Sequence, residues 1–163
     1  MRRYDRAALP PPGGEPRSRR SDRMAGKLIL SDEEWKRRLS PEEYQVLRRH
    51  GTERPYTGCF LGTKDPGTYV CAGCGNPLFP AGRKFESGTG WPSFTEPVAA
   101  DAVVEIEDGS YGMRRTEVRC ARCDGHLGHV FPDGPPPTGR RYCMNSAAMR
   151  HVAEGEPIRL VER

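Results

Sequence analysis

With 163 residues, of which 35% are hydrophobic, the chain is large enough for one domain and a tail, and its 19 glycines and 16 prolines predict many turns rather than long helices. No apolar stretch has the length of a membrane-spanning helix or of a signal-peptide core, so we expect a cytoplasmic protein that does not bind membranes. The net charge of +4 equals the excess of seven basic over three acidic residues in segment 1–23, so the rest is neutral and nucleic acid is not an expected partner.

The basic N-terminal segment, residues 1–26, is expected to be a disordered tail outside the folded domain, which we place at 27–163. Its Pro-Pro-Pro-Gly-Gly run at 10–14 would break the amphipathic helix of a transit peptide. Met24 is an alternative start of the chain, in which case the tail would not exist.

Two short helices are predicted at the start of the domain. Ser31 caps a helix over 32–39, and Glu34 completes a capping box. A second helix begins at Ser40-Pro41 and ends near residue 50, where Gly51 is expected to adopt the left-handed conformation of a helix cap. We expect the pair to lie as a clasp over a β domain.

From residue 55 onward the pattern changes to short strands separated by turns, which predicts a mainly antiparallel β domain. The expected strands cover 67–70, 77–79, 84–85, 103–106, 113–120, 125–131 and 141–146, with an additional edge strand at 158–161. A chain with so many turns would gain stability from a bound metal.

Four of the six cysteines form two Cys-x-x-Cys pairs, Cys71 with Cys74 and Cys120 with Cys123. Two intervening residues allow both thiolates of a pair to face one ion, and two pairs together form the closed tetrahedral site that suits structural Zn²⁺. The pairs are separated by 45 residues, so the ion would join two distant hairpins. A redox role for one pair is the alternative, although neither pair opens an evident helix.

Cys59 and Cys143 remain, and a lone cysteine usually has only a packing role. Cys143 differs because Arg141 and Asn145 lie two residues away on either side, on the same face of the predicted strand. A cation and an amide donor would stabilise a thiolate, which modestly favours a nucleophile at Cys143.

Two histidines and a tryptophan strengthen this interpretation. His126 or His129 could act as general acid or activate the thiolate, although packing and surface roles are common for a single histidine. Trp91, in a Gly-flanked loop, could belong to the core or form a wall for a small apolar group.

Three motifs surround the two cysteine pairs in order, Gly88-x-Gly90-Trp91-Pro92-Ser93-Phe94, His126-Leu127-Gly128-His129-Val130-Phe131 and Arg141-Tyr142-Cys143-x-Asn145-Ser146. With them the chain resembles the type B methionine sulfoxide reductases from about residue 27 to at least residue 149. The resemblance implies a mainly β fold of coiled antiparallel sheets, stapled by a zinc site of four cysteines, with two or three short N-terminal helices. It also implies thiol-dependent reduction of the R epimer of methionine sulfoxide in oxidised proteins.

The same resemblance assigns roles to individual residues. Cys143 would be the nucleophile, Trp91 would hold the substrate's methyl group, and Phe131 would be a further substrate-binding residue. One structural zinc ion per subunit would be bound by Cys71, Cys74, Cys120 and Cys123. The groups around the sulfoxide and the nucleophile would be His126, His129, Arg141 and Asn145.

One position departs from the family pattern, because many members carry a resolving cysteine in the Gly-x-Gly-Trp loop, where this chain has Thr89. A subset of the family uses a cysteine in the region of Cys59, so the resemblance predicts a Cys59–Cys143 disulfide that a thioredoxin-type dithiol reopens. The alternative is an inert Cys59, with an external thiol reducing Cys143 directly. We expect the protein to act as a monomer.

Two other classes of function would explain part of the sequence. A zinc-ribbon module that binds nucleic acid or protein would explain the four paired cysteines and the basic tail, but it leaves Trp91 and Cys143 without a role. A regulatory domain that senses oxidants through Cys59 and Cys143 is the second alternative, and multiple turnovers on a sulfoxide substrate would exclude it.

Overall fold

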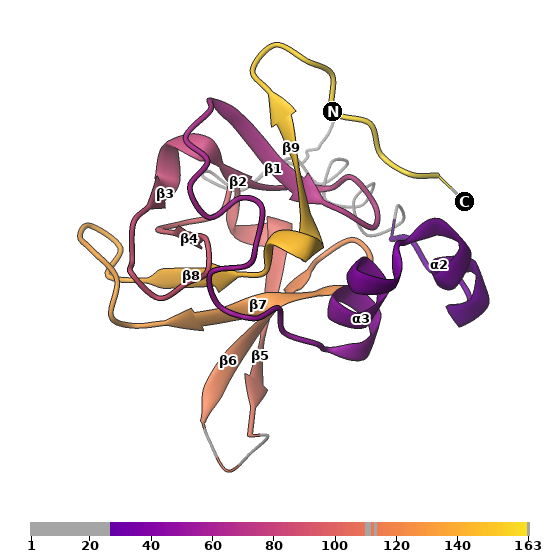
Figure 1. Cartoon of the computed structure of the whole chain (residues 1–163), viewed down its shortest axis with the longest axis horizontal. Coiled ribbons are helices and arrows are strands. Elements are labelled where there is room, and N and C mark those ends of the chain that lie inside the picture. The colour runs from indigo at the N-terminus through magenta and orange to yellow at the C-terminus, as the bar shows by residue number, and fades with distance from the viewer. Residues whose placement is uncertain (1–26, 110–111, 113, 163) are drawn as a thin grey trace, which may run out of the picture.

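The computed structural model describes residues 27–109, 112 and 114–162, and this part of the chain forms two antiparallel sheets with two α-helices beside them (Figure 1). The mainly β prediction is therefore confirmed, whereas the predicted tail over residues 1–26 lies outside the described residues. No helix in the described part of the chain is long and apolar enough to cross a membrane.

The smaller sheet has three strands in the order β2-β1-β9, with bounds β1 (Gly67–Cys71), β2 (Pro77–Pro80) and β9 (Met149–Ala153). The larger sheet has the order β3-β4-β8-β7-β6-β5. Its bounds are β3 (Lys84–Phe85), β4 (Ser93–Phe94), β5 (Val103–Asp108), β6 (Arg115–Cys120), β7 (His126–Phe131) and β8 (Arg141–Met144). Three short 3-10 turns complete the order of elements, η1 (Ala81–Arg83), η2 (Ala100–Ala102) and η4 (Ser146–Ala148).

The core between the sheets is aromatic. Tyr69 and Phe79 come from the smaller sheet, Phe94 and Tyr142 from the larger one, and all four side chains are buried. The rings of Phe79 and Phe94 stack with centroids 4.7 Å apart, and Tyr69 meets Phe94 edge-on at 5.3 Å. These offset and edge contacts are the favoured arrangements of aromatic pairs, and they fix β4 against the smaller sheet.

Both predicted helices are present, as α2 (Asp32–Arg38) and α3 (Pro41–Arg49). The full capping box occurs at α3, where Ser40 Oγ accepts from the Glu43 N–H at 3.1 Å and the Glu43 carboxylate accepts from the Ser40 N–H at 2.9 Å. The box expected for α2 is only half formed. Ser31 Oγ accepts from the Glu34 N–H, but the Glu34 carboxylate binds the side chain of Arg38.

The left-handed residue that ends α3 lies one position earlier than predicted. His50, not Gly51, has positive φ (57°), and Gly51 donates its N–H to the carbonyl of Gln45 at 2.8 Å. Histidine is among the non-glycine residues that enter this region most often. The side chain of His50 is also held there by Glu117, at 3.0 Å.

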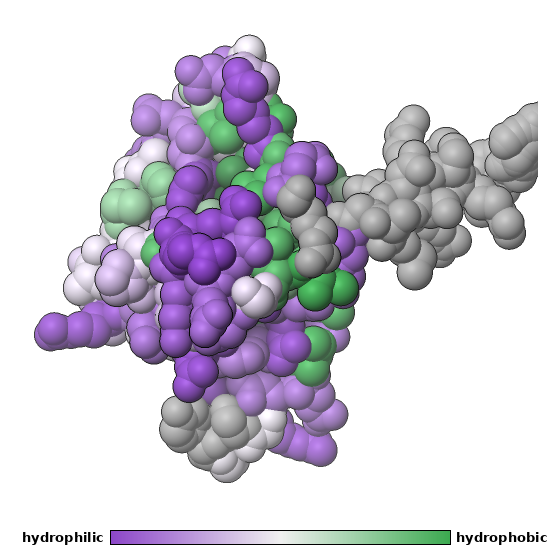
Figure 2. Space-filling model, turned by 90° about the vertical axis from the view of Figure 1, so that its right-hand side faces the viewer, coloured by the Kyte–Doolittle hydropathy of each residue, from purple (hydrophilic) through white to green (hydrophobic). Residues whose placement is uncertain are grey.

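The helices cover the cysteine pairs. Trp35 of α2 and Leu47 of α3 are buried and pack on the turn at Gly73, and Leu47 also covers Gly125 after the second pair. Arg48 stacks its guanidinium on the ring of Trp35 at 4.6 Å and donates to the carbonyl of Cys123 at 2.9 Å. Trp35 is the only buried residue of α2, and the other side chains of this helix face solvent at least in part. The helix side of the molecule therefore presents a largely hydrophilic surface, with hydrophobic side chains in a narrower band (Figure 2).

The strand predictions were wrong at four places. Residues 158–161 form no strand, because β9 already occupies the edge of β1 opposite β2, and the segment is held instead by single bonds such as Val161 N–H to Cys74 O at 2.8 Å. Two short strands, β4 and β9, were not predicted. β8 ends at Met144, two residues before the expected end, because the chain turns into η4.

Gly128 in β7 is expected to be essential for the fold. A Cβ atom at this position would collide with the carbonyl oxygen of Cys143 and lie 3.0 Å from Met144 Cα. Because these neighbours are backbone atoms of the paired strand, they have little room to move. Gly128→Ala should therefore lower the free energy of unfolding by at least about 1–3 kcal/mol, as measured by denaturant unfolding.

Gly82→Ala is the matched control, because no heavy atom lies within 4 Å of a Cβ built there. Equal unfolding midpoints for the two variants would contradict the close packing of β7 on β8.

Candidate active site and metal centre

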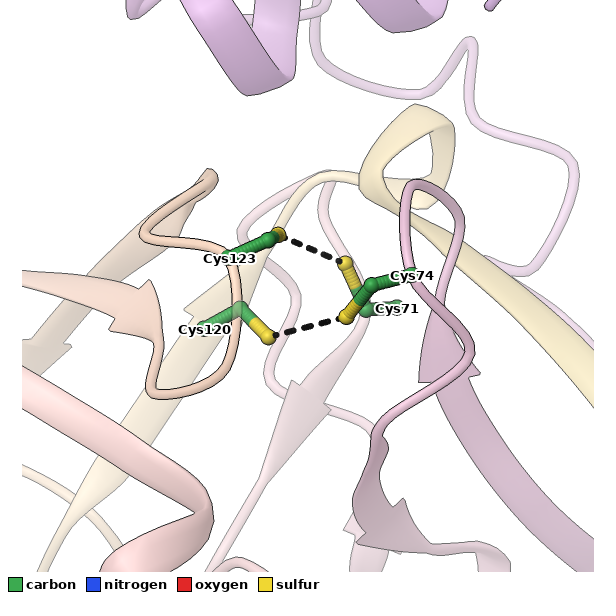
Figure 3. Close-up of side chains that lie close together, drawn as sticks. All are labelled: Cys71, Cys74, Cys120 and Cys123. Atoms are coloured by element: carbon green, nitrogen blue, oxygen red, sulfur yellow. Dashed lines mark hydrogen bonds between the residues drawn. The ribbon is translucent and has the colours of Figure 1, made fainter. Parts of the chain in front are cut away.

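The two Cys-x-x-Cys pairs come together at the ends of β1 and β6, with all four side chains buried (Figure 3). Cys71 Sγ lies 3.7 Å from Cys123 Sγ, and Cys74 Sγ lies 3.5 Å from Cys120 Sγ. All four sulfur atoms lie within 4.8 Å of one another, so the cluster could hold one metal ion. The prediction that these cysteines form a single site is confirmed.

The surroundings of the cluster support sulfur atoms that carry negative charge. The Gly73 N–H points at Cys71 Sγ at 3.4 Å, and the Asn76 side-chain amide points at Cys120 Sγ at 3.7 Å. Hydrogen bonds among the four thiols lower the pKa of Cys74 and raise the pKa values of Cys71 and Cys120, so the cluster places a negative charge on Cys74. Since the thiolate is the form that binds metals, the site is prepared for a cation.

Cys143 lies in a separate cavity of about 230 Å³. Strand pairing assembles it, because β7 and β8 place His129 opposite Cys143 and Phe131 opposite Arg141. The predicted residues that line the cavity are Trp91, His129, Phe131, Arg141, Cys143 and Asn145. The other lining residues are Thr52, Thr89, Arg115 and Gly128.

Arg141 is held rigidly beside Cys143. Its guanidinium makes two bonds to the Asp133 carboxylate, at 2.9 and 3.2 Å, and lies 4.4 Å from the centre of the Phe131 ring. Paired hydrogen bonds and an aromatic face together restrict the rotation of an arginine side chain. The cavity therefore has a fixed cation next to its sulfur atom and an apolar wall behind that cation.

Burial raises the pKa of the Cys143 thiol above its ordinary value, while Thr89 and Arg141 act in the opposite direction. Arg141 thus acts in the direction that the sequence analysis expected, but burial has the larger effect on the pKa of Cys143. Asn145 contributes little because its amide is already engaged, accepting from Glu53 N–H at 2.9 Å and donating to Leu127 O at 3.0 Å. Thr89 Oγ1, 3.9 Å from Cys143 Sγ, is the hydroxyl that approaches the sulfur instead.

Glu53 organises the rear of the cavity and was missed by the sequence analysis. Its buried carboxylate accepts from the N–H groups of Ser146 and Ala147 at 2.9 and 3.0 Å. Its backbone carbonyl accepts from the indole N–H of Trp91 at 3.0 Å. One loop residue thus fixes the indole and the chain immediately after Cys143, and nothing in the local sequence pattern indicates this.

The two histidines occupy different places. His129 lines the Cys143 cavity and its Nε2 lies 2.9 Å from Asp108 Oδ2. His126 is buried behind it, with Nδ1 2.7 Å from Glu117 Oε2 and its ring 5.5 Å from that of His129. Burial lowers the pKa of His126, although Glu117 opposes this. The structure therefore brings His129, and not His126, to the lining of the cavity.

Arg115 also lines the Cys143 cavity and was not singled out from the sequence. Its Nη2 lies 3.5 Å from Asp108 Oδ2, and its buried Nε has no hydrogen-bond partner among the described residues. The alternation Arg115-x-Glu117-x-Arg119 along β6 was the signal that could have revealed a polar face on this strand.

Cys59 lies in an exposed turn, carries a free thiol and is not among the residues that line the Cys143 cavity. Its loop is nevertheless tied to the chain that follows Cys143, since the Phe60 N–H donates to Ser146 Oγ at 3.2 Å. Gly58 lies against the same hydroxyl and the Glu53 carboxylate. The two thiols thus belong to segments that share anchors.

Comparison with known proteins agrees with this geometry. A family model described as the SelR domain matches residues 39–153. A peptide methionine sulfoxide reductase MsrB of Agrobacterium fabrum is 55% identical over 129 residues, which cover 79% of this chain and 96% of the relative. The chain belongs to the MsrB family.

Two other MsrB proteins have a similar sequence identity to this chain. The one from Bradyrhizobium diazoefficiens is 60% identical over 124 residues, covering 76% of this chain and 89% of its own. The one from Methanosarcina barkeri is 56% identical over 134 residues, which cover 82% of this chain and 94% of the relative. The resemblance drawn from the sequence motifs is thereby confirmed, and the match spans both the MsrB cavity around Cys143 and the four-cysteine cluster.

The raised pKa of Cys143 leads to a measurable pH dependence. In a Cys59→Ser background, the rate of alkylation of Cys143 by iodoacetamide should reach half its plateau above pH about 8.5, the midpoint for an exposed cysteine. Arg141→Leu should move the midpoint further up, because Arg141 lowers the pKa of Cys143. Thr89→Val should act in the same direction.

Arg140→Leu is the matched control. Arg140 precedes Arg141 but pairs with Glu105 at 2.6 Å, so its loss should leave the midpoint unchanged. A midpoint for Cys143 below that of an exposed thiol would contradict the dominance of burial.

Proposed function

We propose that this protein is a peptide-methionine (R)-S-oxide reductase that repairs oxidised proteins by reducing methionine sulfoxide to methionine. The observation that carries the proposal is the arrangement of Cys143, an aromatic wall and a fixed guanidinium in one small cavity. Membership of the MsrB family, whose relatives are named peptide methionine sulfoxide reductases, supports the same reaction. The choice of the R epimer rests on the resemblance to type B enzymes.

The chemistry needs a sulfur nucleophile and a proton donor close together, since a sulfoxide sulfur becomes electrophilic only when its oxygen is protonated or strongly hydrogen-bonded. In our proposal the methyl group of the substrate packs against Trp91 and Phe131. The sulfoxide oxygen accepts hydrogen bonds from the side chains of Arg141 and His129. His129 is the preferred donor of the proton. His126 and Asn145 act indirectly, because they hold the neighbouring strand and turn.

Cys143 then attacks the sulfoxide sulfur, the bond from that sulfur to oxygen breaks, and the oxygen ends on Cys143 as sulfenic acid. The substrate sulfur gains two electrons and the cysteine sulfur loses two. Cys59 displaces water from the sulfenic acid to form the Cys59–Cys143 disulfide, which a thioredoxin-type dithiol reduces by exchange. Because Cys59 lies outside the cavity lining, its turn has to move inward for this step.

We assign the four-cysteine cluster to one structural zinc ion. A tetrahedral ion with zinc–sulfur bonds of about 2.3 Å separates its sulfur ligands by about 3.8 Å, and two of the separations here are 3.5 and 3.7 Å. The ion would supply a permanent link between the ends of β1 and β6 and takes no part in the proposed chemistry. We place the enzyme in the cytoplasm as a monomer, where reducing conditions keep its thiols available.

Substrate choice provides the direct test. The separated R and S epimers of a blocked methionine sulfoxide are incubated with the protein and dithiothreitol, and methionine formation is measured. Only the R epimer should be consumed over many turnovers, and Cys143→Ser should abolish the reaction because the nucleophile is gone. Normal turnover by Cys143→Ser, or consumption of the S epimer alone, would overturn the proposal.

The role of Cys59 is tested by mass mapping after a single turnover without reductant. The expected product is a peptide pair linked by the Cys59–Cys143 disulfide, with two free thiols lost per methionine formed. In Cys59→Ser the sulfenic acid of Cys143 should persist and react with dimedone. A stable sulfenic acid in the unmodified protein, with Cys59 still free, would instead show that an external thiol reduces Cys143.

A further inference from the structure

A second group of metal-binding side chains lies outside the Cys143 cavity and apart from the four cysteines. His50 at the end of α3, Glu117 of β6 and His126 of β7 each offer one ligand atom, and these atoms lie within 4.8 Å of one another. Glu117 Oε2 is 3.0 Å from His50 Nδ1 and 2.7 Å from His126 Nδ1. Side chains from α3, β6 and β7 thus converge on one carboxylate oxygen.

The donor set suits a borderline divalent cation. Two imidazole nitrogens and one carboxylate are ligands that Zn²⁺, Co²⁺ and Ni²⁺ accept readily. Although burial opposes it, hydrogen bonds from Arg119 and His126 keep the pKa of Glu117 lowered, so its carboxylate is ionised. The lowered pKa of His126 keeps this imidazole neutral, as a metal ligand must be.

His126 also has a nitrogen without a visible purpose. Its Nε2 has no hydrogen-bond partner among the described residues, and it is buried, since His126 is only 3% exposed. Buried polar atoms are rarely left unpaired, so such an atom calls for an explanation. A metal on Nδ1 would move the ring proton to Nε2, which breaks no existing hydrogen bond but does not supply Nε2 with a partner.

The group opens onto a cavity of about 590 Å³ that is separate from the Cys143 cavity but shares Thr52, Arg115 and His129 with it. Water in this space can fill the coordination positions that the three protein ligands leave open. His50 is about half exposed, so its ring can adjust by the few tenths of an ångström that coordination requires. An ion can therefore enter from solvent without disturbing the core.

Arg119 both supports and weakens the site. It donates Nε to Glu117 Oε2 at 3.0 Å and Nη2 to Oε1 at 3.1 Å. Since a carboxylate has about four lone-pair positions, Arg119 can keep Oε1 while the ion takes Oε2, which is a common arrangement around metal-bound carboxylates. Arg49 and Arg115 also border the cavity, so positive charge reduces the affinity for a cation.

We propose that His50, Glu117 and His126 bind a divalent transition-metal ion, and that the bound ion inhibits the enzyme reversibly. The ring of His126 lies 5.5 Å from that of His129, which lines the Cys143 cavity. An ion fixed on His126 places two positive charges directly behind a side chain of the Cys143 cavity. The inhibitory role rests on the proposed function, whereas the binding site itself does not.

Binding is tested by calorimetric titration of Zn²⁺ into the zinc-loaded protein, in a Cys59→Ser, Cys143→Ser background that removes the free thiols. One further equivalent of zinc per chain should bind. His50→Gln can retain the hydrogen bond to Glu117 but is a poor metal ligand, so it should weaken this second binding event at least about tenfold. His50→Ala should do the same.

His151→Ala is the matched control, because His151 lies in β9 of the other sheet, 3.1 Å from the carbonyl of Pro66. Its second-site affinity should equal that of the unmodified protein. In the same background, Co²⁺ bound at the site should show visible ligand-field bands without the sulfur-to-cobalt charge-transfer band of a thiolate site. Absence of a second equivalent, or unchanged affinity in both His50 variants, would overturn the proposal.

Inhibition is measured separately as single-turnover methionine formation by the pre-reduced protein with its native cysteines, without added thiol. Zn²⁺ should slow the unmodified protein and His151→Ala, but have a much weaker effect on His50→Gln at the same concentration. Equal inhibition of all three would place the ion on Cys143 and overturn the inhibitory role. A protein without any reductase activity would refute the proposed function, while the calorimetric result would still stand.

Discussion

The junction of the two sheets at four sulfur atoms is the constraint on which the rest of the structure depends. Cys71 ends a strand of the smaller sheet and Cys120 ends a strand of the larger one, and both lie in the buried cluster. Helices α2 and α3 cover this junction through Trp35 and Leu47. With only 35% hydrophobic residues, the chain relies on a compact polar junction of this kind in addition to its aromatic core.

The geometry of the Cys143 cavity is set by strand pairing and by Glu53. Pairing of β7 with β8 sets His129 opposite Cys143, and the absence of a side chain at Gly128 allows the two strands to approach closely. Glu53 adds a second fixed point through its bonds to Trp91 and Ser146. Reactive groups from four separate segments are therefore held on rigid elements, as a preorganised site requires.

Sequence patterns predicted the class of fold, both helices and the four-cysteine cluster, because spacing and periodicity are local properties. They did not predict β9, whose residues show no clear alternation and become a strand only by pairing with β1. The contribution of Glu53 and the withdrawn position of His126 also depend on contacts between residues that are distant in sequence. The effect of burial on the pKa of Cys143 was also not predictable, since neighbours in sequence do not reveal how deeply a sulfur is buried.

The protonated state that burial imposes on Cys143 has a consequence for survival under oxidant attack. Hydrogen peroxide oxidises the anionic sulfur, so a neutral thiol in a narrow cavity reacts slowly with it. Cys143 is therefore expected to react with peroxide more slowly than an exposed cysteine does. Any molecule that reacts with this sulfur must also enter the cavity that Trp91 and Phe131 line.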